Sequence, residues 1–148
     1  MTLEEIGYDA NIKRLLAYGS LPGVWTENDR SEREPLLDTY AGTYVKEEIQ
    51  AEALTRNLEG FARFIVAIAA RATRPLDYTK VASQAAITRA SAIRFVEILE
   101  DTLLVFRVEP FARRHARRIV QHPRYYFFDN GVLNGSGTMR TVKRRSYQ

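Results

Sequence analysis

The feature that most constrains the fold is the spacing of small and apolar residues in the stretch YTKVASQAAITRASAIRFVEIL, residues 78–99. Val81 and Ala82 stand on a first short helix, predicted over residues 78–85, where small side chains let a second helix approach closely. Ala86 and Ile87 then predict a turn. The anchors predicted for the second helix, over about residues 90–101, are Ile93 or Phe95 together with Ile98 and Leu99. This spacing is typical of a helix-turn-helix.

The hydrophobic period changes after Asp101. Residues 103–108 and 125–128 are β-branched, aromatic and apolar, and a basic segment separates them, which predicts a two-stranded hairpin with a long tip. We therefore predict a mainly α fold, a winged helix-turn-helix with a two-stranded β-hairpin wing, preceded by an α-helical extension. One departure is that Ala86 stands where such turns often hold glycine. A left-handed conformation at an alanine would cost about 1 kcal/mol.

The first third of the chain predicts helices and connectors. The expected elements are a helix over 12–18 that ends at Gly19, a turn over 20–23, a polar connector over 27–35, an amphipathic helix over 36–54 and a helix capped by Asn57. We expect three parts: a helical extension over 1–55, a winged-helix domain over 56–134 and a basic, disordered tail over 135–148.

Charge divides the chain into two halves. The net charge of +4 combines 12 acidic and 6 basic side chains up to Gly60 with 6 acidic and 16 basic ones from Phe61 onward, so the halves carry −6 and +10. A basic half favours polyanionic partners, because cationic side chains neutralise phosphates.

The basic residues of the helix-turn-helix and the hairpin are candidates for nucleic-acid contact. In such a motif the start of the second helix meets base edges and phosphates, and guanidinium groups suit phosphate contact. The candidate residues are Lys80, Arg89, Ser91, Arg94, Arg107, Arg113, Arg114, Arg117, Arg118 and Arg124. Two alternative roles stay open for them. Arg89 and Arg94 can be the solvated face of a helix, and the wing can pair with the acidic half of the same chain or of a second copy.

No catalytic constellation is visible in the sequence. It contains neither a phosphate-binding P-loop nor a dinucleotide fingerprint nor a GxSxG elbow, so we expect no cofactor and no enzymatic activity. Asp129 ends the strand-like run in FFDNG and is more typical of a turn than of an active site. Cysteine is absent, and the two histidines, His115 and His122, lie seven residues apart without a carboxylate cluster, so we expect no metal site. We expect a cytoplasmic protein without membrane segments.

Several blocks of the sequence together resemble a known family. They are LLAYGSLPGV, LLDTYAGTYVKEEI, RNLEGFARF, the helix-turn-helix, LEDTLLVFRVEPFARR and RYYFFDNGVL. This series resembles the carboxy-terminal domain of unknown function 4143 of predicted AAA+-type ATPases of bacteria and archaea, over about residues 12–133. The resemblance implies an ATPase domain before this region, with residues 1–55 similar to a linker near its lid, and a nuclease-like segment after it. The tail GSGTMRTVKRRSYQ does not resemble the family, so no nuclease residue is carried over, and we expect a fragment or a truncated gene product.

Two functions follow as expectations. The first is binding of double-stranded DNA through the arginine-rich wing and the second helix of the helix-turn-helix. The second is a protein interaction or dimerisation module that binds an ATPase domain or a second copy of the chain, as a non-catalytic remnant of an AAA+-type ATPase.

Overall fold

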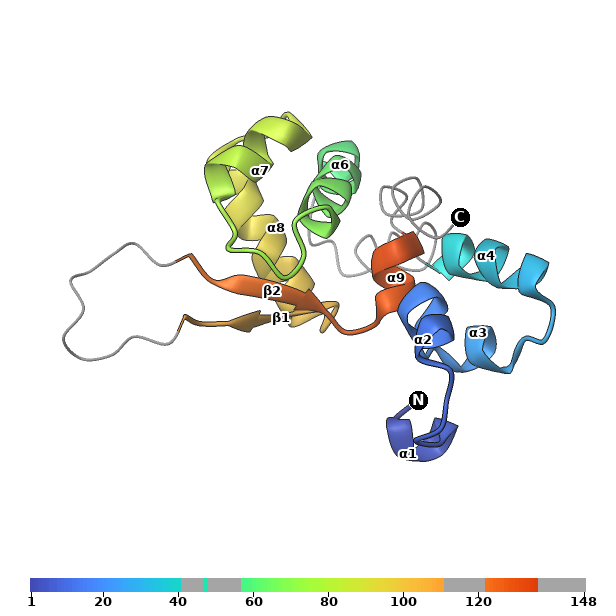
Figure 1. Ribbon diagram of the computed structural model, residues 1–148. Helices are drawn as coiled ribbons and strands as arrows, with labels where there is room; N and C mark the ends of the chain where they lie inside the picture. The colour runs from blue at the N-terminus through green and yellow to red at the C-terminus, as the bar shows by residue number, and fades with distance from the viewer. Residues whose placement is uncertain (41–46, 48–56, 111–121, 136–148) are drawn as a thin grey trace. The chain divides into compact units, whose positions relative to one another are not determined.

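The computed structural model describes residues 1–40, 47, 57–110 and 122–135 (Figure 1). These residues are mainly helical and include one two-stranded antiparallel sheet. The chain divides into two compact units, which are described separately. Unit 1 contains Met1–Leu54 and Asp129–Gln148, and unit 2 contains Thr55–Phe128.

Unit 1 is built from short helices. They are α1 (Leu3–Ile6), α2 (Ile12–Tyr18), α3 (Pro22–Thr26), α4 (Arg30–Thr39) and α9 (Asn130–Gly135). Helix α2 has the bounds predicted from the sequence. The Asn11 side chain accepts a hydrogen bond from the Arg14 backbone N–H at its start, and Gly19 ends it with a φ of 72°. Both signals are local, which explains why they can be read from the sequence.

Two predicted connectors of unit 1 are helical instead. Pro22 is the first residue of α3. Its fixed φ suits the first turn of a helix, and the lack of an N–H costs nothing there because an N–H at this position has no acceptor within the helix. Asp29 caps α4 by accepting a hydrogen bond from the Ser31 N–H at 2.8 Å, so the helix starts within the predicted polar connector. Pro35 lies inside α4. Most of the amphipathic helix predicted over 36–54 falls outside the described residues.

Helix α9 packs against α2 and α4 and belongs to unit 1, whereas the sequence-based division put residues 129–134 in the winged-helix domain. The Asp129 carboxylate is buried and caps α9, accepting hydrogen bonds from the N–H groups of Gly131 (2.7 Å) and Val132 (3.1 Å). It also accepts from the N–H (2.6 Å) and hydroxyl (3.1 Å) of Ser20, just after α2. Asn134 donates to the carbonyls that end α2. These long-range bonds decide where α9 lies. The predicted tail beyond Gly135 lies outside the described residues.

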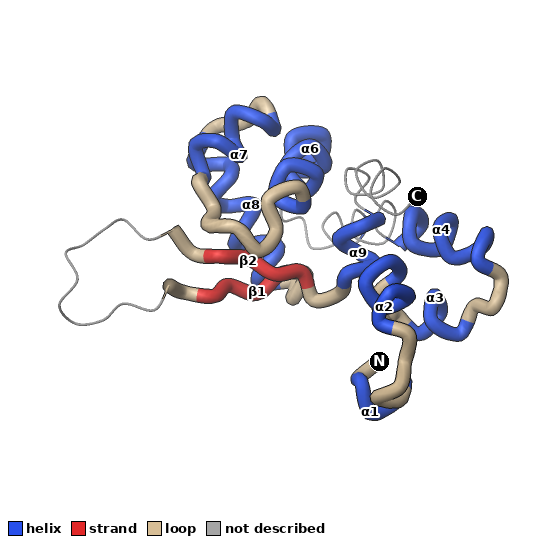
Figure 2. The backbone as a smooth tube through the Cα atoms, in the orientation of Figure 1, coloured by secondary structure: helices blue, strands red, loops and turns tan. Residues whose placement is uncertain are grey.

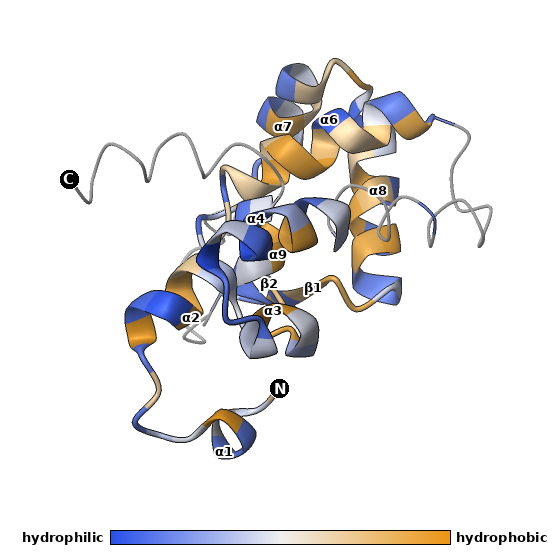
Figure 3. Cartoon of the chain, turned by 90° about the vertical axis from the view of Figure 1, so that its right-hand side faces the viewer, coloured by the Kyte–Doolittle hydropathy of each residue, from blue (hydrophilic) through white to orange (hydrophobic). Residues whose placement is uncertain are grey.

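Unit 2 contains three helices followed by a hairpin in its described part (Figure 2). The elements are α6 (Leu58–Ala69), α7 (Tyr78–Ala85), α8 (Arg89–Asp101), β1 (Val105–Val108) and β2 (Arg124–Phe127). Its core is aromatic. The ring of Phe95 on α8 meets Phe61 and Phe64 of α6 edge to face, with ring centroids 5.1 and 5.5 Å apart. Hydrophobic segments recur along α6, α7 and α8 (orange in Figure 3).

The predicted hairpin is confirmed as an antiparallel pair in which Val105 lies opposite Phe127 and Val108 opposite Arg124. Its tip, residues 111–121, lies outside the described residues. The connection between α6 and α7 also joins β2, which the sequence did not indicate. Pro75 forms a β-bridge with Arg124, and the N–H groups of Thr73 and Leu76 donate to the carbonyls of Tyr125 (3.0 Å) and Pro123 (2.9 Å).

Candidate nucleic-acid interface

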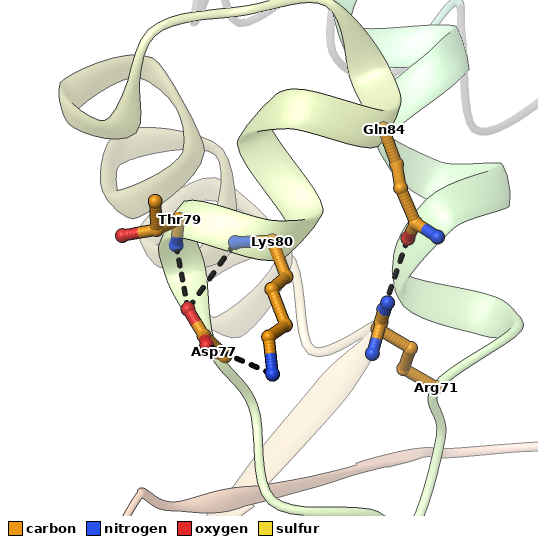
Figure 4. A network of polar contacts seen from close by, with 5 residues as sticks. All are labelled: Arg71, Asp77, Thr79, Lys80 and Gln84. Atoms are coloured by element: carbon orange, nitrogen blue, oxygen red, sulfur yellow. Dashed lines mark hydrogen bonds and ion pairs between the residues drawn. The ribbon is translucent and has the colours of Figure 1, made fainter.

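The start of α7 is set by a side-chain cap. The Asp77 carboxylate accepts hydrogen bonds from the N–H groups of Thr79 (3.0 Å) and Lys80 (3.2 Å), and these bonds lower the pKa of Asp77, the bond from Lys80 most strongly (Figure 4). Arg71, just after α6, donates to the side chain of Gln84 on α7 at 2.9 Å. Helix α7 is therefore held at both of its ends by polar contacts.

The turn between α7 and α8 is tight, and its geometry depends on Ala86. This residue is left-handed, with φ 52° and ψ 48°. Its N–H donates to the Ser83 carbonyl (3.2 Å) and the Ile87 N–H donates to the Ala82 carbonyl (3.0 Å), which is the hydrogen-bond pattern of a Schellman motif. The strained alanine that the sequence raised as a possibility is present.

Helix α8 has one buried and one exposed side. The residues buried on its inner side are Ala92, Phe95, Val96, Ile98 and Leu99. Thr88 caps the helix, since its hydroxyl oxygen accepts a hydrogen bond from the Ser91 N–H at 3.0 Å. Arg89 and Arg94 are exposed on the first half of α8. Within the described part of the chain, neither arginine has a carboxylate within ion-pair distance.

The acidic residues of α8 lie on its second half: Glu97, Glu100 and Asp101. Partial burial raises the pKa of Glu100, against the opposing effect of nearby Arg107. The charge of α8 therefore changes sign along its length, and its cationic part begins directly after the turn. This is the end of the second helix that a helix-turn-helix presents to base edges.

Three of the other predicted site residues already have partners. Lys80 forms an ion pair with Asp77 at 3.7 Å, Arg107 forms one with Glu109 at 2.5 Å, and the Ser91 hydroxyl shares a 2.9 Å hydrogen bond with the hydroxyl of Thr88. Exposed pairs of this kind contribute little to stability, so the two cations stay accessible to a polyanion. Ser91, in contrast, uses its hydroxyl in the capping structure of α8.

The two described arginines of the hairpin lie on opposite faces of it. Arg107 is paired in register with buried Tyr125, whereas Arg124 is paired with Val108. Residues that are paired across the two strands share a face of the sheet, and successive residues along a strand alternate between faces. The side chains of Arg107 and Arg124 therefore leave the sheet on opposite faces. The sequence predicted six arginines on one hairpin, and the strand register places two of them, Arg107 and Arg124, on different faces. The other four, Arg113, Arg114, Arg117 and Arg118, lie outside the described residues.

The inner face of the hairpin is closed by a pair of tyrosines. The hydroxyl groups of Tyr78 on α7 and Tyr125 on β2 are 2.9 Å apart. Burial and this hydrogen bond raise the pKa of Tyr125 well above its ordinary value. The bond connects the first helix of the motif to the sheet, which the sequence did not predict, because residues 47 positions apart give no local signal.

The chain has a match among known protein families. A family model described as a domain of unknown function (DUF8612) matches residues 9–142. The chain belongs to this family. The DUF8612 region covers elements of both units, from α2 to α9. No curated protein and no solved structure matches the chain. The predicted membership in a domain of unknown function is confirmed, and because the description of DUF8612 mentions neither domain 4143 nor an activity, the resemblance to domain 4143 and the association with AAA+-type ATPases stay predictions.

The sequence also led to expectations about metal ions and membrane segments, which concern the whole described part of the chain. Across the described ranges, no group of three or more histidine, aspartate or glutamate side chains is placed to hold a metal ion. His122 is described and exposed, and His115 is outside the described residues. Of the helices in the part of the chain that the structure describes, none has the length and hydropathy needed to cross a bilayer.

Proposed function

We propose that unit 2 is a winged-helix module that binds double-stranded DNA, with α8 in the major groove and the hairpin as its wing. The order of α6, a short segment paired to β2, α7, α8 and the hairpin supports this architecture. The tight turn at Ala86 supports the helix-turn-helix in particular, because it fixes the angle between α7 and α8.

The observation that carries the proposal is the pair Arg89 and Arg94. Both are exposed on the first half of α8, without an ion-pair partner among the described residues, and the acidic residues are confined to the second half of the helix. Arg89 has no acidic residue three or four positions away, and Arg94 has one, Glu97, which is not within ion-pair distance of it. Separation of the two signs favours an anionic partner at one end.

The test is fluorescence anisotropy with the full chain and a labelled duplex of about 20 base pairs over a salt series. The binding constant falls as the salt concentration rises, and each phosphate contact that is lost should make the slope of log binding constant against log salt less negative by about 0.9. Replacement of both Arg89 and Arg94 by alanine should therefore weaken binding and reduce the slope. Arg74→Ala removes one exposed charge from the segment between α6 and α7, so it is the matched control for the single replacements Arg89→Ala and Arg94→Ala. Absence of salt-dependent binding, or an effect of Arg74→Ala as large as that of either single replacement, would refute the proposal.

A protein interaction module is the second candidate. It is supported by apolar side chains on the surface of unit 1, where Tyr8 is 79% and Ile12 is 69% exposed. The partner would be an ATPase domain or a second copy of the chain. Sedimentation velocity tests the second case. A monomer at high concentration, together with duplex binding, would favour the first function.

A further inference from the structure

The outer face of the β1–β2 hairpin has an unusual composition. Because side chains alternate along a strand, buried Val105 and Tyr125 define the inner face, and their neighbours point outward. Three of the outward residues are apolar or aromatic: Phe106, Val108 and Tyr126. The fourth is Arg124.

These outward side chains are substantially exposed in an arrangement that the register enforces. Phe106 is 53% and Val108 is 44% exposed. Phe106 lies opposite Tyr126, and their rings stack with centroids 6.0 Å apart and planes inclined by 11°. Phe128, directly after β2, is 41% exposed. The solvent face of an antiparallel pair is ordinarily polar, so an exposed aromatic pair here indicates a ligand.

Charge on this face selects the ligand class. Arg124 lies opposite Val108 and two residues from Tyr126 on the same strand, and no carboxylate of the described residues lies within ion-pair distance of it. The nearby acid, Glu109, is already paired with Arg107. A second copy meeting this face symmetrically would bring its own Arg124, and the two charges would repel. A partner that has both flat apolar groups and negative charge matches the exposed aromatic side chains and Arg124.

We propose that the outer face of this hairpin binds single-stranded nucleic acid. Unpaired bases stack on the Phe106–Tyr126 pair, and Arg124 contacts the backbone phosphates. Aromatic side chains with adjacent cations are the usual composition of such sites, since every base offers a π face and every nucleotide a phosphate. This site uses the outer face of the hairpin and none of the residues of α8, whereas the duplex proposal depends on Arg89 and Arg94 of α8.

The experiment measures anisotropy of the full chain with a labelled thymidine oligonucleotide of about 15 nucleotides, which does not pair with itself. An abasic oligonucleotide of equal length carries the same phosphates without bases. We expect Phe106→Ala to weaken binding of the thymidine probe by about 5- to 150-fold, because that range corresponds to the loss of one stacked base. Arg124→Ala should also weaken it, and binding of the abasic probe should be weak and unaffected by Phe106→Ala.

Controls separate this proposal from the duplex site and from misfolding. Leu103→Ala removes another exposed apolar side chain of unit 2 and should leave binding of the thymidine probe unchanged. Circular dichroism verifies that each variant is folded. The double replacement of Arg89 and Arg94 should weaken only duplex binding. If the thymidine probe does not bind, or binds Phe106→Ala equally well, the proposal is wrong while the duplex site can still stand. If Phe106→Ala instead dissociates a dimer, the face is a self-association surface and the proposal is also wrong.

Discussion

Ala86→Gly is expected to stabilise unit 2, although glycine usually destabilises a protein. Ala86 is exposed, so the change removes no buried contact. Its φ of 52° and ψ of 48° are left-handed, a conformation that costs an L-residue about 1–2 kcal/mol. Glycine removes this cost, but its greater conformational freedom in the unfolded chain offsets about 0.5–1 kcal/mol of the gain. The free energy of unfolding should therefore rise by about 0–1.5 kcal/mol.

A second alanine-to-glycine variant serves as a control for the effect of glycine on the unfolded chain. Ala62 is exposed within α6, and Ala62→Gly makes the same chemical change at a helical position. There glycine should lower the free energy of unfolding by about 1 kcal/mol. Since both variants change the unfolded chain equally, their difference of about 1–2.5 kcal/mol reports the backbone conformation at Ala86.

Native-state amide hydrogen exchange measures this difference within unit 2. The amides of Val96 and Leu99, two buried residues of α8, should report the free energy of opening of this helix. The fluorescence of Trp25, the only tryptophan, reports unit 1 and should be unchanged in both variants. If Ala86→Gly destabilises α8 as much as Ala62→Gly does, the left-handed turn is refuted.

Three other predictions concern stability. Asp129→Ala should lower the unfolding free energy of unit 1 by about 2–3 kcal/mol, since a buried carboxylate with four hydrogen bonds is lost. Urea unfolding followed by Trp25 fluorescence measures this, and a loss below about 0.5 kcal/mol would contradict it. Phe95→Ala should cost unit 2 about 3–5 kcal/mol in thermal unfolding because it opens a cavity between aromatic rings, and a loss below about 1 kcal/mol would contradict that packing. The pKa of Asp77 is lower in the folded chain, so its contribution is complete above the unfolded pKa and is lost as the pH falls through the folded pKa. Asp77→Ala should thus lower the melting temperature at neutral pH but not in strong acid, and an equal effect at both would argue against the cap.

The elements that the sequence predicted well are those with local signals. Helices α2 and α7 have their predicted bounds, and α8, which Thr88 caps, starts one residue earlier than predicted. Capping side chains and hydrophobic period act within one or two turns, so they can be read without the rest of the chain. The same holds for the hairpin, because its two runs of β-branched, aromatic and apolar residues are typical of strands.

The candidate interface was only partly visible in the sequence. Arg89 and Arg94 were named correctly as exposed residues at the start of α8, because the period of a helix determines its exposed side. Proximity in the sequence grouped Arg107 with Arg124, whereas the register puts them on opposite faces. The exposed aromatic residues of the hairpin were predicted as ordinary strand residues. The alternation of Phe106 and Val108 with their neighbours was the available signal, but only the packing of the inner face shows which set is exposed.

The sequence alone determined the two helices on either side of Ala86, the hairpin strands and the division of charge, because each depends on neighbouring residues or on counting. Tertiary structure alone decided the assignment of α9, which bonds through Asp129 to Ser20, a residue 109 positions away. It also decided the pairing of Pro75 with β2. These features are contacts between residues far apart in the chain, which leave no pattern in the local sequence.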